Sequence, residues 1–365
     1  MPIYMDRHDV SEAVTAEIVA QIHQEDLKIQ HKYGCRGLTY WFDDVRKTAF
    51  CLIEAPDKDA IIDMHKKAHG EVPHQVIEVD TTIVESFLGR IEDPEKSQNT
   101  DLNIINDPAF RTIMVVNIEH HSFPNHNPFS SITKVQQVYF QMIAILKSFE
   151  GTIVKQSGEG FLLSFRTVTN AVLCALKIQE KFNSFRIKNH LNFAELNIGL
   201  HAGVPVTEKK SIFEDTIKSA ERMSYISLAE IVVSTEVKQL YESENLSTVL
   251  NQNLVHMLSS GEIKFINSFM EFTENEWQNT GLKVDDFEKH IGISKSKLYR
   301  EITRLTGKSP NVFLLHYRLR KSLNPLQRHQ GNVADVAYSS GFNSPSYYAK
   351  CFRKKYGIMP SELVR

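Results

Sequence analysis

The sequence predicts a multi-domain protein in which two α+β domains precede an all-α domain. Two polar stretches, near residues 92–107 and 242–252, interrupt the hydrophobic patterning and divide the chain into predicted domains at 1–93, 108–245 and 255–365. A length of 365 residues suits two or three domains. A repeated helical pattern near the C-terminus separates the last domain from the strand-containing first two.

The first domain alternates strand-like and helix-like segments. Two helical patterns at residues 12–32 and 57–69 separate strand-like runs at 3–7, 37–42, 48–54 and 75–79. The resulting order, βαββαβ, is ferredoxin-like. Such a sheet leaves one face uncovered, and because two of these faces can pack together, a homodimer is expected.

Six of the fifteen histidines fall in this first domain. His65 and His69 are four residues apart on one predicted helix and therefore share a face. The first strand and the second helix end at the same edge of the predicted sheet, which places His8 near this pair. On the other helix, Asp26 follows His23 by three residues and offers an oxygen ligand.

These histidines and the aspartate form a candidate site for a divalent transition metal. Imidazole and carboxylate ligands suit nickel, zinc or copper. The predicted ligands are His8, His23, Asp26, His65 and His69. The alternative is that the histidines are exposed or capping residues without a metal.

Residues 1–80 resemble a family of small ferredoxin-like bacterial proteins described as nickel-binding. The resemblance is carried by Phe50-Cys51-Leu52-Ile53-Glu54-Ala55-Pro56-Asp57 and by His65-Lys66-Lys67-Ala68-His69. It implies a metal site with nickel as the first candidate.

The middle domain has the pattern of a second α/β unit. Strands are predicted near 110–118, 195–202 and 230–234, with a hairpin at 151–165, and helices at 132–149, 170–186 and 216–227. The domain resembles a class III nucleotidyl cyclase through three runs: Val154-Lys155-Gln156-Ser157-Gly158-Glu159-Gly160-Phe161, Asn197-Ile198-Gly199-Leu200-His201-Ala202-Gly203 and Asp215-Thr216-Ile217-Lys218-Ser219-Ala220-Glu221-Arg222.

The positions that carry cyclase chemistry are only partly kept. Cyclases hold two divalent ions on a pair of aspartates, but the matching positions are Asn117 and Glu159, and the late-helix asparagine is Lys218. The resemblance leaves Lys155, Asp215 and Arg222 as possible nucleotide-binding residues. A cyclase-like domain without catalytic activity, which dimerises or binds a ligand, is therefore expected.

The third domain contains two copies of one helix-turn-helix pattern, related by an offset of 50 residues. The offset aligns Ser294 with Ser344, Gly307 with Gly357 and Pro310 with Pro360. Gly292 and Gly341 are placed to end the first helix of each unit in a left-handed conformation. Ser294 and Ser344 are the predicted N-caps of the helices that follow.

This third domain is also basic. Residues 281–365 carry 16 Lys and Arg against 6 Asp and Glu, which leaves 26 against 38 for the rest of the chain. A basic module on an acidic body is typical of proteins that bind nucleic acid.

The run Gly341-Phe342-Asn343-Ser344-Pro345-Ser346-Tyr347-Tyr348, followed by residues 352–361, resembles the C-terminal signature of the AraC family of bacterial transcription regulators. The resemblance implies a seven-helix domain whose recognition helices, near 294–306 and 344–356, enter successive major grooves of double-stranded DNA. The connecting helix, near 311–327, departs from the pattern by carrying Pro325, which would stop or kink it.

The exposed polar residues of the two recognition helices are the predicted DNA contacts. Base contacts are expected from Ser294, Lys295, Lys297, Arg300, Asn343, Ser344, Ser346 and Lys350, and phosphate contacts from Arg304, Arg353 and Lys354.

Composition restricts the location of the protein. No apolar stretch approaches the roughly 18 residues of a membrane span, and the N-terminus has no apolar secretory region. Cys35, Cys51, Cys174 and Cys351 form no CxxC pair. A cytoplasmic protein without membrane contact is expected.

The sequence thus predicts a transcription regulator of AraC type controlled by metal or nucleotide binding to its first two domains. The metal ion is the expected effector. Two alternatives stay open: a nucleotidyl cyclase with a DNA-binding appendage, and a metal-buffering protein whose DNA binding is independent of the metal.

Overall fold

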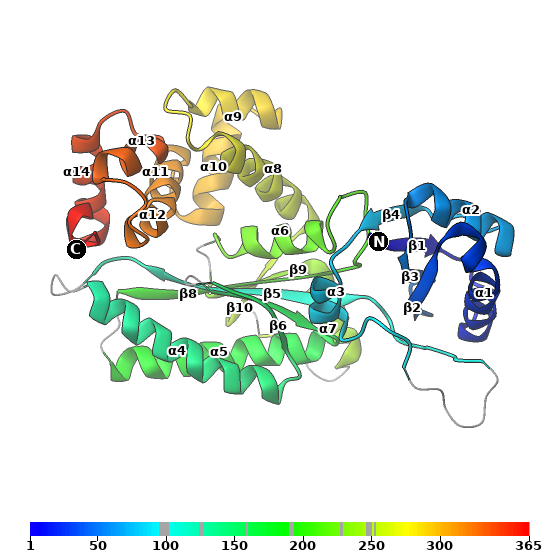
Figure 1. The fold of residues 1–365 in the computed structure, drawn as a ribbon. Coiled ribbons are helices and arrows are strands. Elements are labelled where there is room, and N and C mark those ends of the chain that lie inside the picture. Colours follow the sequence, from blue (N-terminus) through cyan, green and yellow to red (C-terminus); the bar gives the residue numbers. More distant parts are fainter. Residues whose placement is uncertain are drawn as a thin grey trace.

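The computed structural model describes residues 1–94, 102–123, 128–157, 160–189, 193–226, 229–245, 250–251 and 253–364. A four-stranded sheet lies at the N-terminal end, a six-stranded sheet in the middle, and a group of helices at the C-terminal end (Figure 1).

The N-terminal sheet has the strand order β2-β3-β1-β4 and is antiparallel throughout. Its elements are β1 (Ile3–Asp9), α1 (Ala16–Ile29), β2 (Arg36–Asp43), β3 (Thr48–Glu54), α2 (Lys58–Ala68) and β4 (Gln75–Glu78). The predicted ferredoxin-like order is therefore confirmed. The first helix is shorter than the predicted 12–32, since it begins only at Ala16 and a 3₁₀ turn at Gln30–Tyr33 follows its end.

Both faces of this sheet are buried. Alternate residues point to opposite faces of a strand, so Tyr4 packs under α1 and α2 while its neighbour Met5 faces the other way. The second face presents Trp41, Phe50 and Leu52, all fully buried against α3 (Thr81–Leu88) and the middle sheet.

The prediction that this second face pairs with another copy of the chain is wrong. The helix α3, which the sequence did not reveal, follows β4 and covers the apolar face within the same chain. The homodimer itself stays a prediction.

A buried arginine holds α3 in place. The Arg111 guanidinium donates to the carbonyl oxygens of Phe87 and Leu88 at the end of α3, at 3.0 and 3.2 Å. It also donates to the carbonyls of Pro108 and Phe110. The last carbonyls of a helix have no partner within the helix, and Arg111 supplies one from the first residue of the middle sheet.

The middle sheet has the strand order β10-β9-β8-β5-β7-β6. Its strands are β5 (Arg111–His120), β6 (Thr152–Ser157), β7 (Gly160–Phe165), β8 (Ala194–Gly203), β9 (Ile231–Ser234) and β10 (Val255–Leu258). β10 falls in the range predicted for the third domain, but it pairs in parallel with β9 and forms an edge of this sheet.

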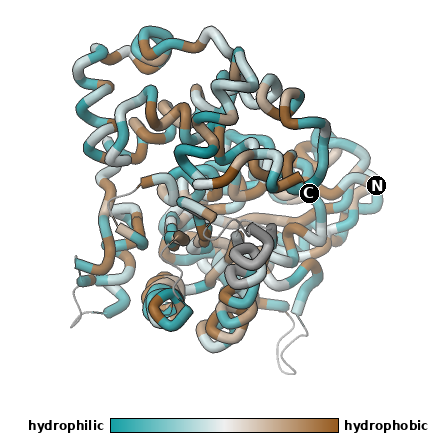
Figure 2. Tube along the Cα trace, turned by 90° about the vertical axis from the view of Figure 1, so that its left-hand side faces the viewer, coloured by the Kyte–Doolittle hydropathy of each residue, from teal (hydrophilic) through white to brown (hydrophobic). Residues whose placement is uncertain are grey.

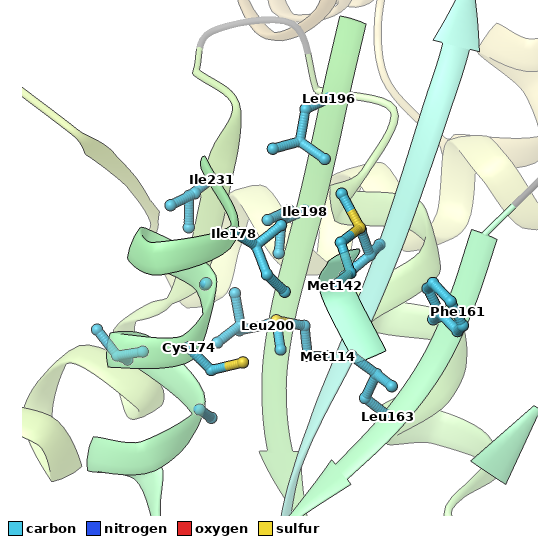
Figure 3. Packing of buried hydrophobic residues seen from close by; sticks show 14 of the residues in the cluster. Met114, Met142, Phe161, Leu163, Cys174, Ile178, Leu196, Ile198, Leu200 and Ile231 are labelled. Atoms are coloured by element: carbon cyan, nitrogen blue, oxygen red, sulfur yellow. The ribbon is translucent and has the colours of Figure 1, made fainter. Parts of the chain in front are cut away.

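Helices cover both faces of the middle sheet. One face packs against α4 (Pro128–Ser148), α5 (Val168–Lys188) and α7 (Thr235–Glu244), where Met142, Cys174 and Ile178 meet Leu163 and Leu200 (Figure 3). The opposite face carries α6 (Glu214–Met223). Hydrophobic and hydrophilic stretches alternate along the helices, as expected where one side is buried (Figure 2).

The C-terminal region is all-helical. It consists of α8 (Ser260–Glu276), α9 (Val284–Ile291), α10 (Lys295–Thr306), α11 (Pro310–Lys321), α12 (Leu323–Gln327), α13 (Val333–Ser339) and α14 (Pro345–Tyr356). Gly292, Gly307 and Gly357 end their helices with positive φ. The Ser294 and Ser344 side chains accept from the backbone amides of Lys297 and Tyr347 as N-caps.

The connecting helix is shorter than predicted. It ends at Lys321, four residues before Pro325, and Pro325 lies inside the short helix α12. The helix break therefore precedes the proline, at Ser322, whose amide still donates to the Arg318 carbonyl.

The C-terminal helices are packed tightly on the middle sheet. Met223 and Val232 share one hydrophobic cluster with Phe269 of α8 and Leu298 of α10. At the other end, the Lys355 ammonium on α14 pairs with the Glu119 carboxylate on β5 at 3.1 Å, and the Phe123 amide donates to the Tyr356 carbonyl. Both recognition units thus contact the body of the protein.

The Glu119–Lys355 pair gives a test of this contact. Glu119→Gln leaves the buried Lys355 charge without its counter-ion, so the free energy of unfolding should fall by about 3 to 5 kcal/mol at pH 7. Urea unfolding measures it. Replacing both residues by apolar ones, as in Glu119→Leu with Lys355→Met, should restore most of the loss.

The same pair predicts a pH dependence. Burial raises the pKa of Glu119, but the charges of Lys355 and Arg320 lower it by more, so that the pKa falls to about 2. The folded-state pKa lies below the unfolded value of about 4.3, so the stabilisation is present above that pH and is lost as the pH falls toward 2. The difference between wild type and Glu119→Gln should therefore shrink between pH 5 and 3; a constant difference would contradict the assignment.

Candidate metal centre and nucleic-acid interface

Buried histidines and carboxylates gather between the helices and the N-terminal sheet. Two groups have the spacing of metal ligands: Asp26, His65 and His69 form one, and Asp6, His8 and Cys51 form the other. Within each group, the possible ligand atoms all lie within 4.8 Å of one another. Among the predicted ligands, the structure therefore brings together Asp26, His65 and His69, with His8 in the adjoining group.

The His65 ring joins the two groups. Its Nδ1 lies 3.1 Å from the Asp26 Oδ1 and its Nε2 lies 2.9 Å from the Asp6 Oδ2. The His69 Nε2 is 3.2 Å from the same Asp26 oxygen. The His8 Nε2 is 3.5 Å from the Asp6 Oδ2.

This arrangement concentrates positive charge on His65. Burial lowers the pKa of its imidazole, but the hydrogen bonds and charges of Asp26 and Asp6 outweigh burial and raise the pKa to about 10. Burial raises the pKa of Asp6, but His8 and His65 hold it well below its ordinary value. The pKa of Asp26 is likewise lowered against the effect of burial by His65 and His69. The centre is thus built around one positive charge held between two carboxylates.

His23 stands apart from both groups. Its Nε2 is 3.7 Å from an oxygen of Asp93, and its ring contacts the Tyr40 ring at a centroid distance of 4.8 Å. It lines the same cavity as Asp26 and His65.

Sequence reasoning missed Asp6 and Cys51. Asp6 is two residues before His8 on β1, so the two side chains share a face of the strand. The strand register then places Cys51 opposite Asp6, where its backbone amide donates to the Asp6 Oδ1 at 2.9 Å. The alternation of side chains along the strand that carries His8 was a signal that could have identified Asp6. Identifying Cys51 required knowing how two strands pair.

The predicted DNA contacts lie on the outer sides of α10 and α14 and in the turns that precede these two helices. Ser344, the N-cap of α14, is partly buried, and the other ten residues are exposed: Ser294, Lys295, Lys297, Arg300, Arg304, Asn343, Ser346, Lys350, Arg353 and Lys354. The opposite side of each helix is buried, with Leu298 and Ile302 in one and Tyr348 and Phe352 in the other. Packing thus fixes which side of each helix faces outward.

Carboxylates neutralise part of this surface. Lys295 pairs with Asp285 at 2.6 Å, and Arg300 pairs with the adjacent Glu301 at 3.2 Å. Arg304 pairs with Glu262 at the start of α8 as well as with Glu301. Exposed pairs of this kind contribute little to stability, so a phosphate can replace the carboxylate at small cost.

Two of the candidate nucleotide-binding residues, Arg222 and Asp215, already have partners within the chain. Arg222, near the end of α6, pairs with Glu274 of α8 at 2.7 Å, and Asp215, at its start, accepts from the Thr207 hydroxyl at 2.9 Å. Burial and the charge of Glu274 raise the pKa of Glu221, and the charges of Lys321 and then of Lys155 on β6 lower it by less. The predicted metal position Glu159 lies outside the described residues, and the Asn117 amide donates to the Ser224 hydroxyl.

Two family models match parts of this chain. The model described as nickel responsive protein SCO4226-like matches residues 4–79. A helix-turn-helix domain model matches residues 288–365. In the described part of the chain, the helices are too short or too polar to cross a membrane.

Curated relatives are similar over a limited length. The chain is 36% identical over 94 residues to the HTH-type transcriptional activator RhaS of Mannheimia succiniciproducens, covering 26% of this chain and 35% of the activator. It is 30% identical over 105 residues to histidine kinase P4 of Formosa agariphila, covering 29% of this chain and 8% of the kinase. The chain therefore spans about a third or less of these relatives.

Among solved structures, SCO4226 from Streptomyces coelicolor is 28% identical, with 21% of this chain and 94% of that chain covered at a TM-score of 0.20.

The charge arrangement of the metal-free centre predicts a loss of stability at high pH. The folded-state pKa of His65 lies above the unfolded value near 6.5, so its stabilisation is complete below about pH 6.5 and is lost as the pH rises toward 10. Urea unfolding in the presence of a chelator should show a fall over this range that His65→Gln lacks. The exposed His31→Gln should retain the fall, and an equal pH dependence in all three proteins would disprove the charge assignment.

Proposed function

We propose that this chain is a sequence-specific DNA-binding transcription regulator of AraC type. The observation that carries the proposal is the placement of the basic side chains on the exposed sides of two equivalent helices, α10 and α14, held by one helical domain. The match of residues 288–365 to a helix-turn-helix family supports it, as does the similarity to a protein named as a transcriptional activator.

The two helices supply different kinds of contact in this proposal. Arg300 lies in the middle of α10 and has the planar guanidinium that recognises guanine in the major groove. Lys354 lies in the last turn of α14, where its ammonium reaches a phosphate. Direct contacts to bases confer specificity, and contacts to phosphates position the protein.

Two variants test this division of roles. Arg300→Ala should weaken binding to the specific site by about 1 to 3 kcal/mol with little effect on random duplex. Lys354→Ala should weaken binding to all sequences. It should also reduce the slope of log affinity against log salt concentration by about one. Lys66→Ala, an exposed lysine of α2, is the control with the same loss of charge. Equal losses on specific and random duplexes for both variants would contradict the roles.

We further propose that the N-terminal domain binds a divalent transition metal, nickel first, and that the metal is the effector. The donor set supports this, because the imidazoles of His65 and His69 and the Asp26 carboxylate lie close enough to share one ion. When bound, the ion would supply the positive charge that the His65 proton otherwise provides. The match of residues 4–79 to a nickel responsive family is the second support.

A route from the metal centre to the DNA-binding helices follows the cores of the protein. The centre lies on one face of the N-terminal sheet, and the other face shares a hydrophobic cluster with β5 and α6. The end of α6 shares the next cluster with α8 and α10. A metal ion acts on DNA binding only if it favours one arrangement of these contacts.

Removal of a ligand tests the metal function. His65→Ala should weaken Ni²⁺ binding at least about ten-fold, because it removes a ligand and the link between two carboxylates. The control is His31→Ala, an exposed histidine outside both groups. Calorimetric titration measures the affinities, and equal affinity of the two variants would contradict the site.

Coupling between metal and DNA separates a regulator from a metal buffer. Ni²⁺ should change the affinity for specific DNA by about 5- to 150-fold in the wild type, and DNA should change the affinity for Ni²⁺ by the same factor. The change should vanish in His65→Ala. Metal binding without any effect on DNA affinity would favour the buffering alternative.

For the middle domain we propose a cyclase-like fold without catalysis. An amide at Asn117 offers no charge for a catalytic cation, and it is already bonded to Ser224. Arg222 is neutralised by Glu274 of α8. In this proposal the domain transmits the state of the metal centre to the helices that bind DNA.

A further inference from the structure

A cavity of about 350 Å³ lies beside the metal centre, between α1 and the N-terminal sheet. Asp26, His65, His69 and His8 are among the residues that line it. This volume exceeds the needs of one ion, since a water molecule occupies roughly 30 Å³ of liquid. The cavity therefore has room for about ten further non-hydrogen atoms beside the ion.

The remainder of the cavity is mainly apolar. Val14, Ile18, Ile22 and Asp26 are spaced by four residues along or just before α1, so they follow one line of the helix surface. The line is apolar until it reaches Asp26 at the metal centre. Val10, Val19 and Val72 add to the apolar wall, and the exposed residues at the rim supply the polar groups Asp9, Ser11, Glu71 and His74.

This wall is unsuited to water bound to a metal. Nickel in nitrogen and oxygen sites favours a square-planar or tetragonal set of donors, whereas Asp26, His65 and His69 supply three. An ion held by these three groups would keep at least one coordination position for another donor, and the cavity adjoins all three ligands. Water lying along Ile22 and Ile18 would find few polar partners on that wall, because the side chains that line it are apolar.

We propose that the site binds its metal together with a small organic chelator that has an apolar body. The chelating nitrogen and oxygen atoms complete the coordination, and the body lies along Ile22 and Ile18, one and two helical turns from Asp26. The lining residues that the structure describes include neither Lys nor Arg, which suits a positively charged or neutral metal complex better than a free anion. This inference rests on the proposed metal function and names the form in which the metal is recognised.

Two amino acids are matched probes of this inference. Glycine and leucine chelate Ni²⁺ through the same amino nitrogen and carboxylate oxygen, and they differ only in the apolar side chain. The full-length protein is titrated with Ni²⁺ alone, with the one-to-one glycine complex and with the one-to-one leucine complex. The leucine complex should bind about ten- to a hundred-fold more tightly than the glycine complex, as expected for burial of one leucine side chain.

Filling the cavity should remove this preference. Ile18 lines the cavity and is 37% exposed, so Ile18→Trp occupies the space with little disturbance of the core. The ratio of leucine to glycine affinity should fall toward one in this variant. Gln21→Trp, on the exposed side of α1 outside the cavity, is the control and should keep the ratio. If Ile18→Trp does not fold, Val72→Trp at the rim, 42% exposed, replaces it.

The outcomes separate this inference from the function on which it rests. Equal affinity for Ni²⁺ and both complexes overturns the chelator and leaves the metal site intact. A leucine preference that survives in both cavity variants also overturns it, because the apolar body would then lie elsewhere. Failure of Ni²⁺ and both complexes to bind overturns the metal function itself.

Discussion

The structure depends on the burial of both faces of the N-terminal sheet. On β1, Asp6 and His8 face a charged centre under the helices, while Met5, just before Asp6, and Trp41 of β2 face an apolar core shared with the middle sheet. Neighbouring residues of one strand thus contact two different environments, because side chains alternate along a strand. A displacement of β1 at the charged centre must be accommodated on its other face, where the core is closely packed.

The second connection is made by α8. Its first turn is fixed by a capping box between Ser259 and Glu262, directly after β10 leaves the middle sheet. Its later turns carry Phe269 into the core of the first helix-turn-helix unit and Glu274 to Arg222 of the middle domain. Glu262 also holds Arg304 of the recognition helix α10. The orientation of α10 is therefore set by the middle domain as well as by its own domain. A structural change in the middle domain can for this reason alter the position of α10.

Much of the fold follows from local sequence signals. The strand at Thr48–Glu54 has the predicted limits, and the glycine turns and serine caps of both helix-turn-helix units are where the repeat places them. The sequence does not predict the helix α3, because its first turn has the β-branched side chains typical of strands: Thr81, Thr82, Ile83 and Val84. Its helical form depends on the Asp80 cap and on burial of Phe87, and burial is a tertiary effect.

The candidate metal centre was accessible to sequence reasoning where it depended on one element. The spacing of His65 and His69 follows from one helix alone, whereas the proximity of Asp26 to them depends on the contact between α1 and α2 in the folded domain. His23 shares α1 with Asp26, but its Nε2 lies 3.7 Å from a carboxylate oxygen of Asp93, which belongs to the polar segment after α3. A segment without periodicity gives no position from sequence, so this partner could not be predicted.

The metal centre buries several ionisable groups, and their burial bears on its role. Buried ion pairs seldom add stability over apolar residues of the same size, and their removal from water is costly. Asp6 and Asp26 are tolerated because the charged His65 lies between them. A divalent ion that takes nitrogen and oxygen ligands here must displace that proton, since a ligating histidine is neutral. Proton and metal thus compete for one position, and the same two carboxylates that stabilise the metal-free fold supply the negative charge that attracts the ion.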